Sequence, residues 1–510
     1  MTNLKKFTST NAILIYLSLF KLILLIIFSG NYGFFRDEYY YIEISKHLDW
    51  GYVDMQPLSA LILALSRFLF GDSIFGIKIF SYIAGSAIVF ISGLIAKELN
   101  GSKFAQIFTA FIVIFSGTVL GVSSYFSMNS FDILLSTLMF YFLVRLINTN
   151  NPKLWLIIGL LFGLGLQNKL TFLFLGFGLA VGIVLTKNRR YLKSKELWIG
   201  AVTAIIIFLP NIIWQFANNF PTLEFMSNAS AYKNKPMGIL EFTLNSLLEL
   251  NPGYSLFILT GIYFLFFNKE GRIFSIIGWI IFSMFLVFVF KNGKPYYMGV
   301  LFPVILAAGV IGADLLVTKY LRPFVRTVLV IFVLPSVVAV IPFSIPVLDV
   351  ETFIGFSKTL GIKPESGERS ELGLLPQFYA DRFGWEEMVQ KVASAYNKLS
   401  DEEKKEALIY GQNYGEAGAV NFYRDKYNLP RAISAHNNYW IWGYPEDFKG
   451  NVLIIIGSNY QDNKEFFEEV KLAETHSNKY GMLFENVDIF ICKKPKMPLD
   501  KIWRRIKFFI

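Results

Sequence analysis

The residues best suited to chemistry lie in one short stretch behind the first apolar run. Arg36, Asp37 and Glu38 precede three tyrosines, of which Tyr40 is the middle one. Asp54 follows in the segment Gly-Tyr-Val-Asp-Met-Gln-Pro-Leu. A carboxylate in a partly desolvated pocket gains basicity, so Asp37 is a candidate general base. The same residues also suit a simple loop at a membrane surface, where tyrosine is common.

A second group of residues is suited to binding a phosphate. Lys294 is followed by Tyr296 and Tyr297, which offer a positive charge and hydroxyl donors. They equally suit a lysine and two tyrosines that anchor a helix end in the interface. Lys169 and Asp132 are weaker candidates, because Lys169 also fits a tight turn and Asp132 also fits the start of a helix.

Long apolar runs must position these residues. The chain has 510 residues, of which 54% are hydrophobic and 17% charged, whereas about 25% are charged in soluble chains. The runs are about 16–22 residues long, which is the length that crosses a bilayer as a helix. We predict about eleven helical spans, at roughly 11–30, 75–96, 104–122, 131–148, 153–168, 170–186, 197–215, 253–268, 273–290, 297–316 and 326–346.

Basic residues predict the orientation, because short loops rich in Lys and Arg stay cytoplasmic. With about eleven spans, every basic cluster falls on the side of the N-terminus. The clusters are Lys5 with Lys6, Lys97 with Lys103, 187–195, Lys269 with Arg272, and Lys319 with Arg322 and Arg326. The loop 31–74 and everything after about residue 347 are then outside the cytoplasm. The net charge of +10 reports this topology and gives no indication of a nucleic acid partner.

The tail reads as a small extracytoplasmic α/β domain. Short β-branched or apolar runs predict strands at 407–410, 452–456 and 487–492, and helices are expected at 415–427 and 462–472. The polar and aromatic loop 436–442 has the composition of a surface on which sugars stack, and also that of an ordinary domain surface.

The predicted division follows these patterns. It gives a membrane domain at 1–346, a soluble domain at 347–498 and a basic amphipathic segment at 499–510. That last segment suits either the membrane surface or a frayed end.

Several segments resemble a known superfamily. Arg-Asp-Glu-Tyr-Tyr-Tyr at 36–41, His-Leu-Asp-Trp-Gly-Tyr-Val-Asp at 47–54 and Pro57-Leu58 look like the first external loop of GT-C glycosyltransferases. The nearest branch contains the protein O-mannosyltransferases and the lipid A aminoarabinose transferase. The segment around Lys294 resembles the Lys/Arg-x-Tyr-Tyr segment of that branch. The chain has Gln56-Pro57 where many relatives have Pro-Pro.

The resemblance implies a GT-C fold and an inverting transfer of one sugar from a polyprenyl-phosphate donor. The acceptor would be a glycolipid, a cell-envelope glycan or a protein outside the cell membrane. Asp37 would take the acceptor proton, and Glu38 or Asp54 would orient the reacting groups. Lys294, a following tyrosine and Lys169 would stabilise the leaving phosphate.

Arg36, Tyr40 and Asp132 would help to bind substrate in this interpretation. No cofactor and no obligatory metal are predicted, although a divalent cation at the carboxylates stays open. The alternative is a membrane transporter or lipid flippase. Such proteins place ionisable residues near the bilayer midplane, whereas the acidic residues here gather in one external loop. The sequence leaves the sugar, the acceptor and the oligomeric state open.

Overall fold

The computed structural model describes residues 2–320 and 324–510. Met1 and residues 321–323, among them Arg322 of the basic loop, lie outside the described residues. The chain forms two compact units. The first unit contains Met1–Asn31, Gln56–Trp214 and Pro236–Leu348, and the second contains Tyr32–Met55, Gln215–Lys235 and Asp349–Ile510. The predicted boundary at 346 lies next to the break at Leu348, but the second unit also takes up two earlier segments. The predicted domain division stays a prediction.

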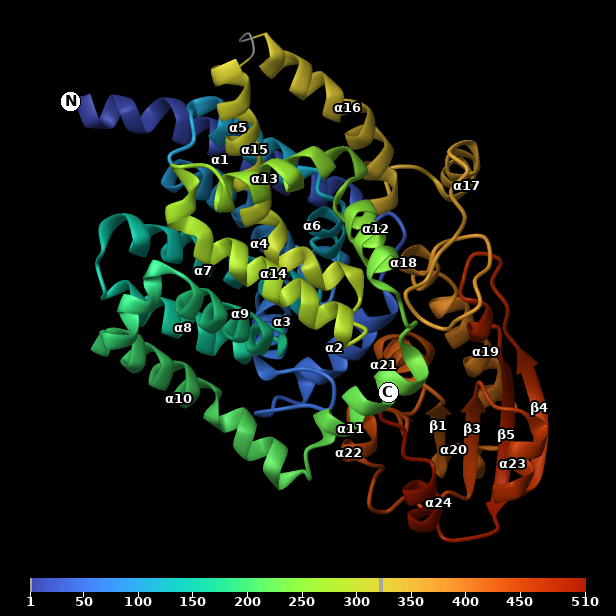
Figure 1. Cartoon of the computed structure of the whole chain (residues 1–510). Helices are drawn as coiled ribbons and strands as arrows, with labels where there is room; N and C mark the ends of the chain where they lie inside the picture. The colour runs from blue at the N-terminus through green and yellow to red at the C-terminus, as the bar shows by residue number, and fades with distance from the viewer. Residues whose placement is uncertain (1, 321–323) are drawn as a thin grey trace. The chain divides into compact units, whose positions relative to one another are not determined.

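The first unit consists of helices (Figure 1). They are α1 (Thr2–Phe28), α3 (Pro57–Phe70), α4 (Ile74–Glu98), α5 (Lys103–Ile114), α6 (Gly117–Val122), α7 (Met128–Thr149), α8 (Leu154–Leu166), α9 (Thr171–Leu185), α10 (Lys195–Ala217, which ends in the second unit), α12 (Ile239–Leu250), α13 (Ser255–Phe266), α14 (Ser275–Phe290), α15 (Phe302–Tyr320) and α16 (Val325–Ser344). The short 3₁₀ helices η1 (Lys187–Lys193) and η5 (Pro295–Leu301) also belong to it.

These helices make the chain a multi-pass membrane protein. Within the described residues, seven helices are long and apolar enough to cross a membrane, or eight if α9 and the bent η1 count as one span. Each predicted span overlaps a helix, but the span predicted at 104–122 is divided between α5 and α6, with a break at 115–116. The helices α5, α8 and α13 are apolar but shorter than a full span. The predicted helical segments are therefore confirmed.

Small residues set the distance between neighbouring spans. A Cβ at Gly159 of α8 would lie 2.2 Å from the carbonyl oxygen of Gly200 in α10. The two backbones are thus in direct contact, which is the packing that small residues allow between membrane helices.

The second unit contains a five-stranded sheet with the order β2-β1-β3-β5-β4. Its strands are β1 (Ala407–Gly411), β2 (Ala432–Ile433), β3 (Val452–Ile456), β4 (Phe467–Thr475) and β5 (Asp488–Pro495). The strands β2, β1 and β3 are parallel, and β5 is antiparallel to both β3 and β4. Every residue of β1 and β3 is buried, which explains their continuous apolar runs.

The second unit also contains short helices (Figure 1). They are α2 (Arg36–Lys46), α11 (Pro221–Asn228), α17 (Val350–Thr359), α18 (Gln377–Ala380), α19 (Trp385–Asn397), α20 (Asp401–Lys405), α21 (Tyr414–Tyr427), α22 (Asn438–Trp442), α23 (Tyr460–Phe466) and α24 (Leu499–Arg505). The strands expected at 407–410, 452–456 and 487–492 and the helix at 415–427 are confirmed. The chain is thus a helical membrane protein with a C-terminal α/β region.

The expected helix at 462–472 is wrong in its second half. The helix α23 ends at Phe466, and β4 begins at Phe467. Residues Phe467–Thr475 are mostly exposed and pair with β5 at the edge of the sheet. The distant strand β5 decides the conformation here, because a polar edge strand has too weak a periodicity to reveal itself.

The basic segment at 499–510 is folded onto the second unit. Leu499 and Ile502 of α24 are buried, and Trp503 belongs to the apolar cluster on the sheet. The Phe508 N–H donates to the carbonyl oxygen of Ala435, and Phe509 is 3% exposed. This end of the chain is therefore ordered by packing against the α/β region and is not frayed.

Candidate functional site

The helix α2 begins at the acidic stretch, and Glu38 stabilises its first turn. The Phe35 N–H donates to Oε2 of Glu38 at 2.8 Å, and the Glu38 side chain is completely buried. A carboxylate at this place satisfies a helix N–H and opposes the helix dipole. The structure thus directs Glu38 toward its own backbone. Its predicted orienting role stays a prediction.

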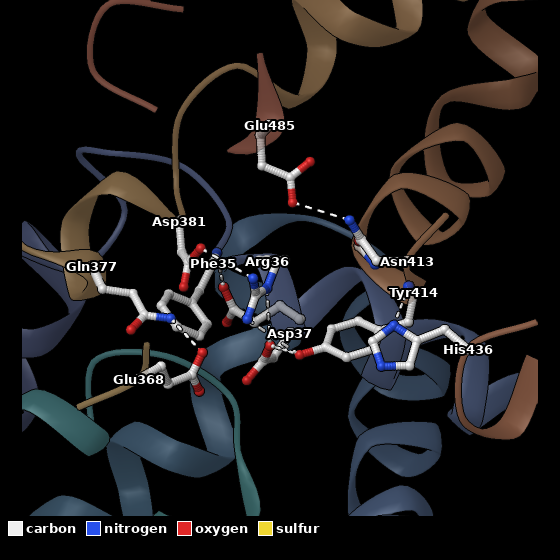
Figure 2. Close-up of polar contacts among 12 residues, drawn as sticks. Phe35, Arg36, Asp37, Glu368, Gln377, Asp381, Asn413, Tyr414, His436 and Glu485 are labelled. Atoms are coloured by element: carbon white, nitrogen blue, oxygen red, sulfur yellow. Dashed lines mark hydrogen bonds and ion pairs between the residues drawn. The ribbon is translucent and has the colours of Figure 1, made fainter. Parts of the chain in front are cut away.

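Asp37 lies beside Glu38 but has different surroundings. The Tyr414 hydroxyl donates to Oδ1 of Asp37 at 2.8 Å, and Nε of Arg36 lies 3.6 Å from the same oxygen (Figure 2). The side chain is 28% exposed. Among the described residues both contacts of Asp37 are made at Oδ1, so Oδ2 faces away from these partners. A partly exposed carboxylate that is held at one oxygen has the geometry of a general base.

Arg36 lies between two carboxylates. Its Nη1 is 3.6 Å from Oδ1 of Asp381, and its backbone N–H donates to the Asp381 carbonyl oxygen at 2.9 Å. Burial raises the pKa of Asp381 to about 6, while the Arg36 charge opposes that rise. The guanidinium also donates to the Tyr414 hydroxyl at 3.4 Å. Arg36 therefore fixes both Asp37 and the tyrosine that holds it.

Tyr40 and Asp54 form a second hydrogen-bonded pair in this unit. The Tyr40 hydroxyl donates to Oδ1 of Asp54 at 2.9 Å, and the Asn437 side chain donates to Oδ2 at 3.0 Å. The Asn438 N–H donates to the Tyr40 hydroxyl at 3.2 Å. Burial raises the pKa of Asp54 to about 6, although the Tyr40 hydrogen bond and the Lys233 charge lower it. Because both oxygens of Asp54 are engaged, this residue suits positioning better than proton transfer.

His436 also borders Tyr414. The Tyr414 N–H donates to Nδ1 of His436 at 3.4 Å, and Nε2 lies 2.9 Å from the Ile510 oxygen. Burial lowers the pKa of His436 to about 3, so the imidazole is neutral at pH 7 and Nε2 carries its proton. The His436 ring therefore positions the backbone beside Tyr414.

The predicted phosphate-binding residues lie in the first unit. Lys169 follows α8, and its ammonium donates to Oδ1 of Asn129 at 2.7 Å. The same ammonium lies 4.4 Å from the centre of the Tyr297 ring and 5.5 Å from that of Tyr296. These distances place a cation over two ring faces. The structure thus brings together Lys169 and the two tyrosines, which are more than 120 residues apart in sequence.

Two further predicted residues belong to the same unit. Asp132 lies in the first turns of α7, is 2% exposed and accepts a hydrogen bond from Thr171. The start of α7 is capped by Ser127, whose hydroxyl accepts the Asn129 N–H, so Asp132 is not the cap. Lys294 lies directly before η5, which begins at Pro295. Asp132 and Lys294 keep their predicted substrate roles as predictions.

Within residues 2–320 and 324–510, no group of three or more His, Cys, Asp or Glu side chains is arranged to hold a metal ion. The carboxylates around Arg36 instead pair with that guanidinium and with hydroxyl and amide donors (Figure 2).

Sequence reasoning missed Tyr414 and Asp381. Both lie more than 340 residues after Arg36, and neither belongs to a recognisable motif. One signal was available for Tyr414: it follows a buried strand and an Asn-capped turn, where side chains gather at the end of a parallel sheet. Asp381 gave no signal, because its importance depends wholly on the partner that it meets.

The chain is similar to proteins of known family and structure. Residues 54–214 match the family model described as dolichyl-phosphate-mannose-protein mannosyltransferase. No curated protein sequence matches the chain. The structure is similar to that of ArnT from Cupriavidus metallidurans in the apo state, with a TM-score of 0.59 and 13% identity over 89% of this chain and 93% of that one. The same ArnT bound to undecaprenyl phosphate gives a TM-score of 0.59 and 12% identity over 95% and 98%.

A more distant similarity extends to an oligosaccharyltransferase. The Archaeoglobus fulgidus enzyme tethered to an acceptor peptide matches with a TM-score of 0.50 and 12% identity, over 84% of this chain and 64% of that one. At such identities the matches establish the fold. The resemblance to GT-C glycosyltransferases is thereby confirmed, through the family model for residues 54–214 and through the fold for most of the chain.

Proposed function

We propose that the protein is a glycosyltransferase that moves one sugar from a polyprenyl-phosphate carrier to an acceptor outside the cytoplasm. The position of Asp37 supports this most strongly. Its Oδ1 is held by the Tyr414 hydroxyl and its side chain is 28% exposed, in a chain with the GT-C fold. The acceptor is a glycolipid, a cell-envelope glycan or a protein.

The reaction is a single displacement with inversion. Oδ2 of Asp37 takes the proton from the acceptor hydroxyl, and the hydroxyl oxygen forms a bond to the anomeric carbon of the donor sugar. The bond from that carbon to the phosphate oxygen breaks, and its electron pair leaves with the polyprenyl phosphate. Arg36 and Tyr414 hold Asp37 in place, while Asp54 with Tyr40 supports the surrounding loop.

The leaving phosphate gains negative charge, so a cation near it contributes most in the transition state. We assign this role to Lys169 and Lys294 with the hydroxyls of Tyr296 and Tyr297. The contact of Lys169 with the two rings supports it, because the rings orient the ammonium without neutralising its charge. No obligatory metal is proposed, since this displacement needs only a base and a stabilised leaving group.

The proposed location is the cell (inner) membrane. The N-terminus is cytoplasmic and the α/β region extracytoplasmic, because the basic loops then remain on one side. The donor reaches the site within the bilayer, and its charged phosphate stays near the interface.

The test uses the full-length protein in lipid nanodiscs. Undecaprenyl-phosphate-linked hexoses and pentoses are offered one at a time, and released undecaprenyl phosphate is measured by mass spectrometry. We expect release with at least one donor, and its loss in Asp37→Asn. If folded protein releases no lipid phosphate from any donor, but moves the donor from one membrane leaflet of proteoliposomes to the other, the protein is a flippase and the proposal is wrong.

A further inference from the structure

The second unit contains a cavity of about 1080 Å³ that the proposed mechanism does not use. It opens beyond the carboxyl ends of the three parallel strands. Gln412 and Asn413 follow β1, His436 follows β2 and Ser458 follows β3, and all four line it. The chain leaves β1 toward β2 on one side and returns to β3 on the other. Ligands bind at such switch points in parallel sheets, and the volume suits a small ligand.

The backbone amides at this place are already satisfied. The Asn413 side chain accepts the Gly415 and Glu416 N–H groups that begin α21. The Glu416 carboxylate accepts the Gln412 and Asn413 N–H groups, and His436 accepts that of Tyr414. These five N–H groups are therefore not open to an anion. A ligand must contact side chains instead.

Exposed aromatic rings border the cavity. Tyr232 is 70% exposed, Phe508 50% and Phe484 43%. Phe484 lies 5.7 Å from the Arg36 guanidinium, and Phe508 lies 5.2 Å from the His436 ring. Flat rings next to planar polar side chains present an apolar face and hydrogen-bonding groups together, which is the chemistry that a sugar ring requires.

The charges on the walls are mixed. The lining cations are Arg36, Lys233, Arg369, Arg505 and Lys507, and the lining anions are Glu368, Glu371, Asp462 and Glu465. Among them Lys233 lies 3.9 Å from Glu368. Such a balance favours a ligand without net charge.

One wall of the cavity leads directly to the proposed base. Tyr414 and Arg36 line the cavity, and both contact Asp37. Arg36 is 8% exposed, and its Nε, which lies 3.6 Å from Oδ1 of Asp37, donates no hydrogen bond among the described residues. A buried donor with this spare capacity can serve a bound hydroxyl oxygen.

We propose that this cavity binds neutral sugar residues of the acceptor, with Tyr232 and Phe484 as stacking surfaces. This inference rests on the proposed function, because only a glycosyltransferase has an acceptor. The binding of a neutral glycan to the cavity can nevertheless be measured without turnover. The acceptor hydroxyl would then reach Asp37 past Tyr414, so the cavity determines which acceptor is used.

The test measures binding and turnover separately with the full chain in nanodiscs. The probes are neutral di- and trisaccharides of glucose, mannose, galactose and N-acetylglucosamine, with inorganic phosphate and sulfated disaccharides as anionic comparisons. Saturation-transfer NMR and titration report binding without any donor. We expect a neutral oligosaccharide to bind, and Tyr232→Ala and Phe484→Ala each to weaken it about tenfold, as loss of a stacking contact implies. Tyr460→Ala is the matched control. The Tyr460 side chain is 45% exposed, close to the 43% of Phe484, but it does not line the cavity.

Each result decides the inference. Binding that Tyr232→Ala and Phe484→Ala weaken, and Tyr460→Ala leaves unchanged, supports it even if no donor is ever turned over. Absence of neutral-sugar binding, tighter binding of the anionic probes, or equal effects of all three substitutions overturns it. Where turnover is found, the two cavity variants should raise the acceptor KM and leave kcat unchanged; a lowered kcat with unchanged KM contradicts the assignment.

Discussion

Replacement of Asp37 by Asn tests the central chemical assumption. The amide keeps the size of the side chain, and its oxygen can still accept the Tyr414 hydroxyl that now lies 2.8 Å from Oδ1. Arg36 keeps its contact with Asp381 at 3.6 Å, so the buried guanidinium retains a negative partner. The substitution therefore removes the ability to take a proton while most of the local structure stays in place.

The expected loss follows from the role of a base. General base catalysis contributes about 10²–10⁴ in rate, which corresponds to roughly 3–5 kcal/mol of the activation free energy. We expect kcat to fall by this factor at saturating donor and acceptor, with donor affinity nearly unchanged. The assay is single-turnover release of undecaprenyl phosphate in nanodiscs, with thermal unfolding measured on the same sample.

Glu38→Gln is the matched control, since it removes the neighbouring charge in the same way. Its side chain caps α2 by accepting the Phe35 N–H at 2.8 Å, and the oxygen of Gln can accept that bond too. We expect less than a tenfold loss of rate and a small loss of stability. If Asp37→Asn keeps more than a tenth of the wild-type rate, or if Glu38→Gln costs as much, Asp37 is not the base.

Four further predictions address other parts of the chain. A Cys in place of Arg190 should react with membrane-impermeant reagents only from the cytoplasmic side; labelling from outside would overturn the topology. Lys169→Ala should lower both kcat and donor affinity, and Lys169→Arg should restore part of each because it keeps the charge; unchanged kinetics of the Ala variant would remove Lys169 from the phosphate site. Gly418→Ala should destabilise the protein by about 1–3 kcal/mol, because its Cβ would lie 2.9 Å from the backbone of Tyr39. In the control Gly355→Ala the added Cβ would meet no atom within 4 Å, so this variant should be neutral or slightly more stable. Equal midpoints of thermal unfolding for the two variants would refute the packing at Gly418. Burial raises the Asp381 pKa from 3.8 to about 6, so the folded chain binds this proton more tightly than the unfolded chain. Its contribution to the unfolding free energy therefore falls as pH rises from about 4 to 6, by at most about 3 kcal/mol. Asp381→Asn should flatten that dependence in unfolding scans, and an unaltered slope would contradict the assignment.

The sequence alone determined the helical membrane part of this protein. Each apolar run satisfies its own backbone hydrogen bonds as a helix, so its conformation depends little on distant partners. The strands β1 and β3 were also predictable, because they are buried throughout and their sequences are short, nearly continuous apolar runs. The same local information pointed to Asp37, whose neighbours in sequence are unusual for a loop.

Only the tertiary structure decided what surrounds these residues. Nothing local distinguishes Glu38, which caps a helix, from Asp37, which stays accessible, because that difference depends on where α2 points each side chain. Tyr414 reaches Asp37 since α2 packs on α21, and Gly418 permits this approach by presenting no side chain toward Tyr39. The strand β4 likewise exists because β5 lies beside it. Contacts between segments hundreds of residues apart are selected by packing of the whole unit, and no window of the sequence contains both partners.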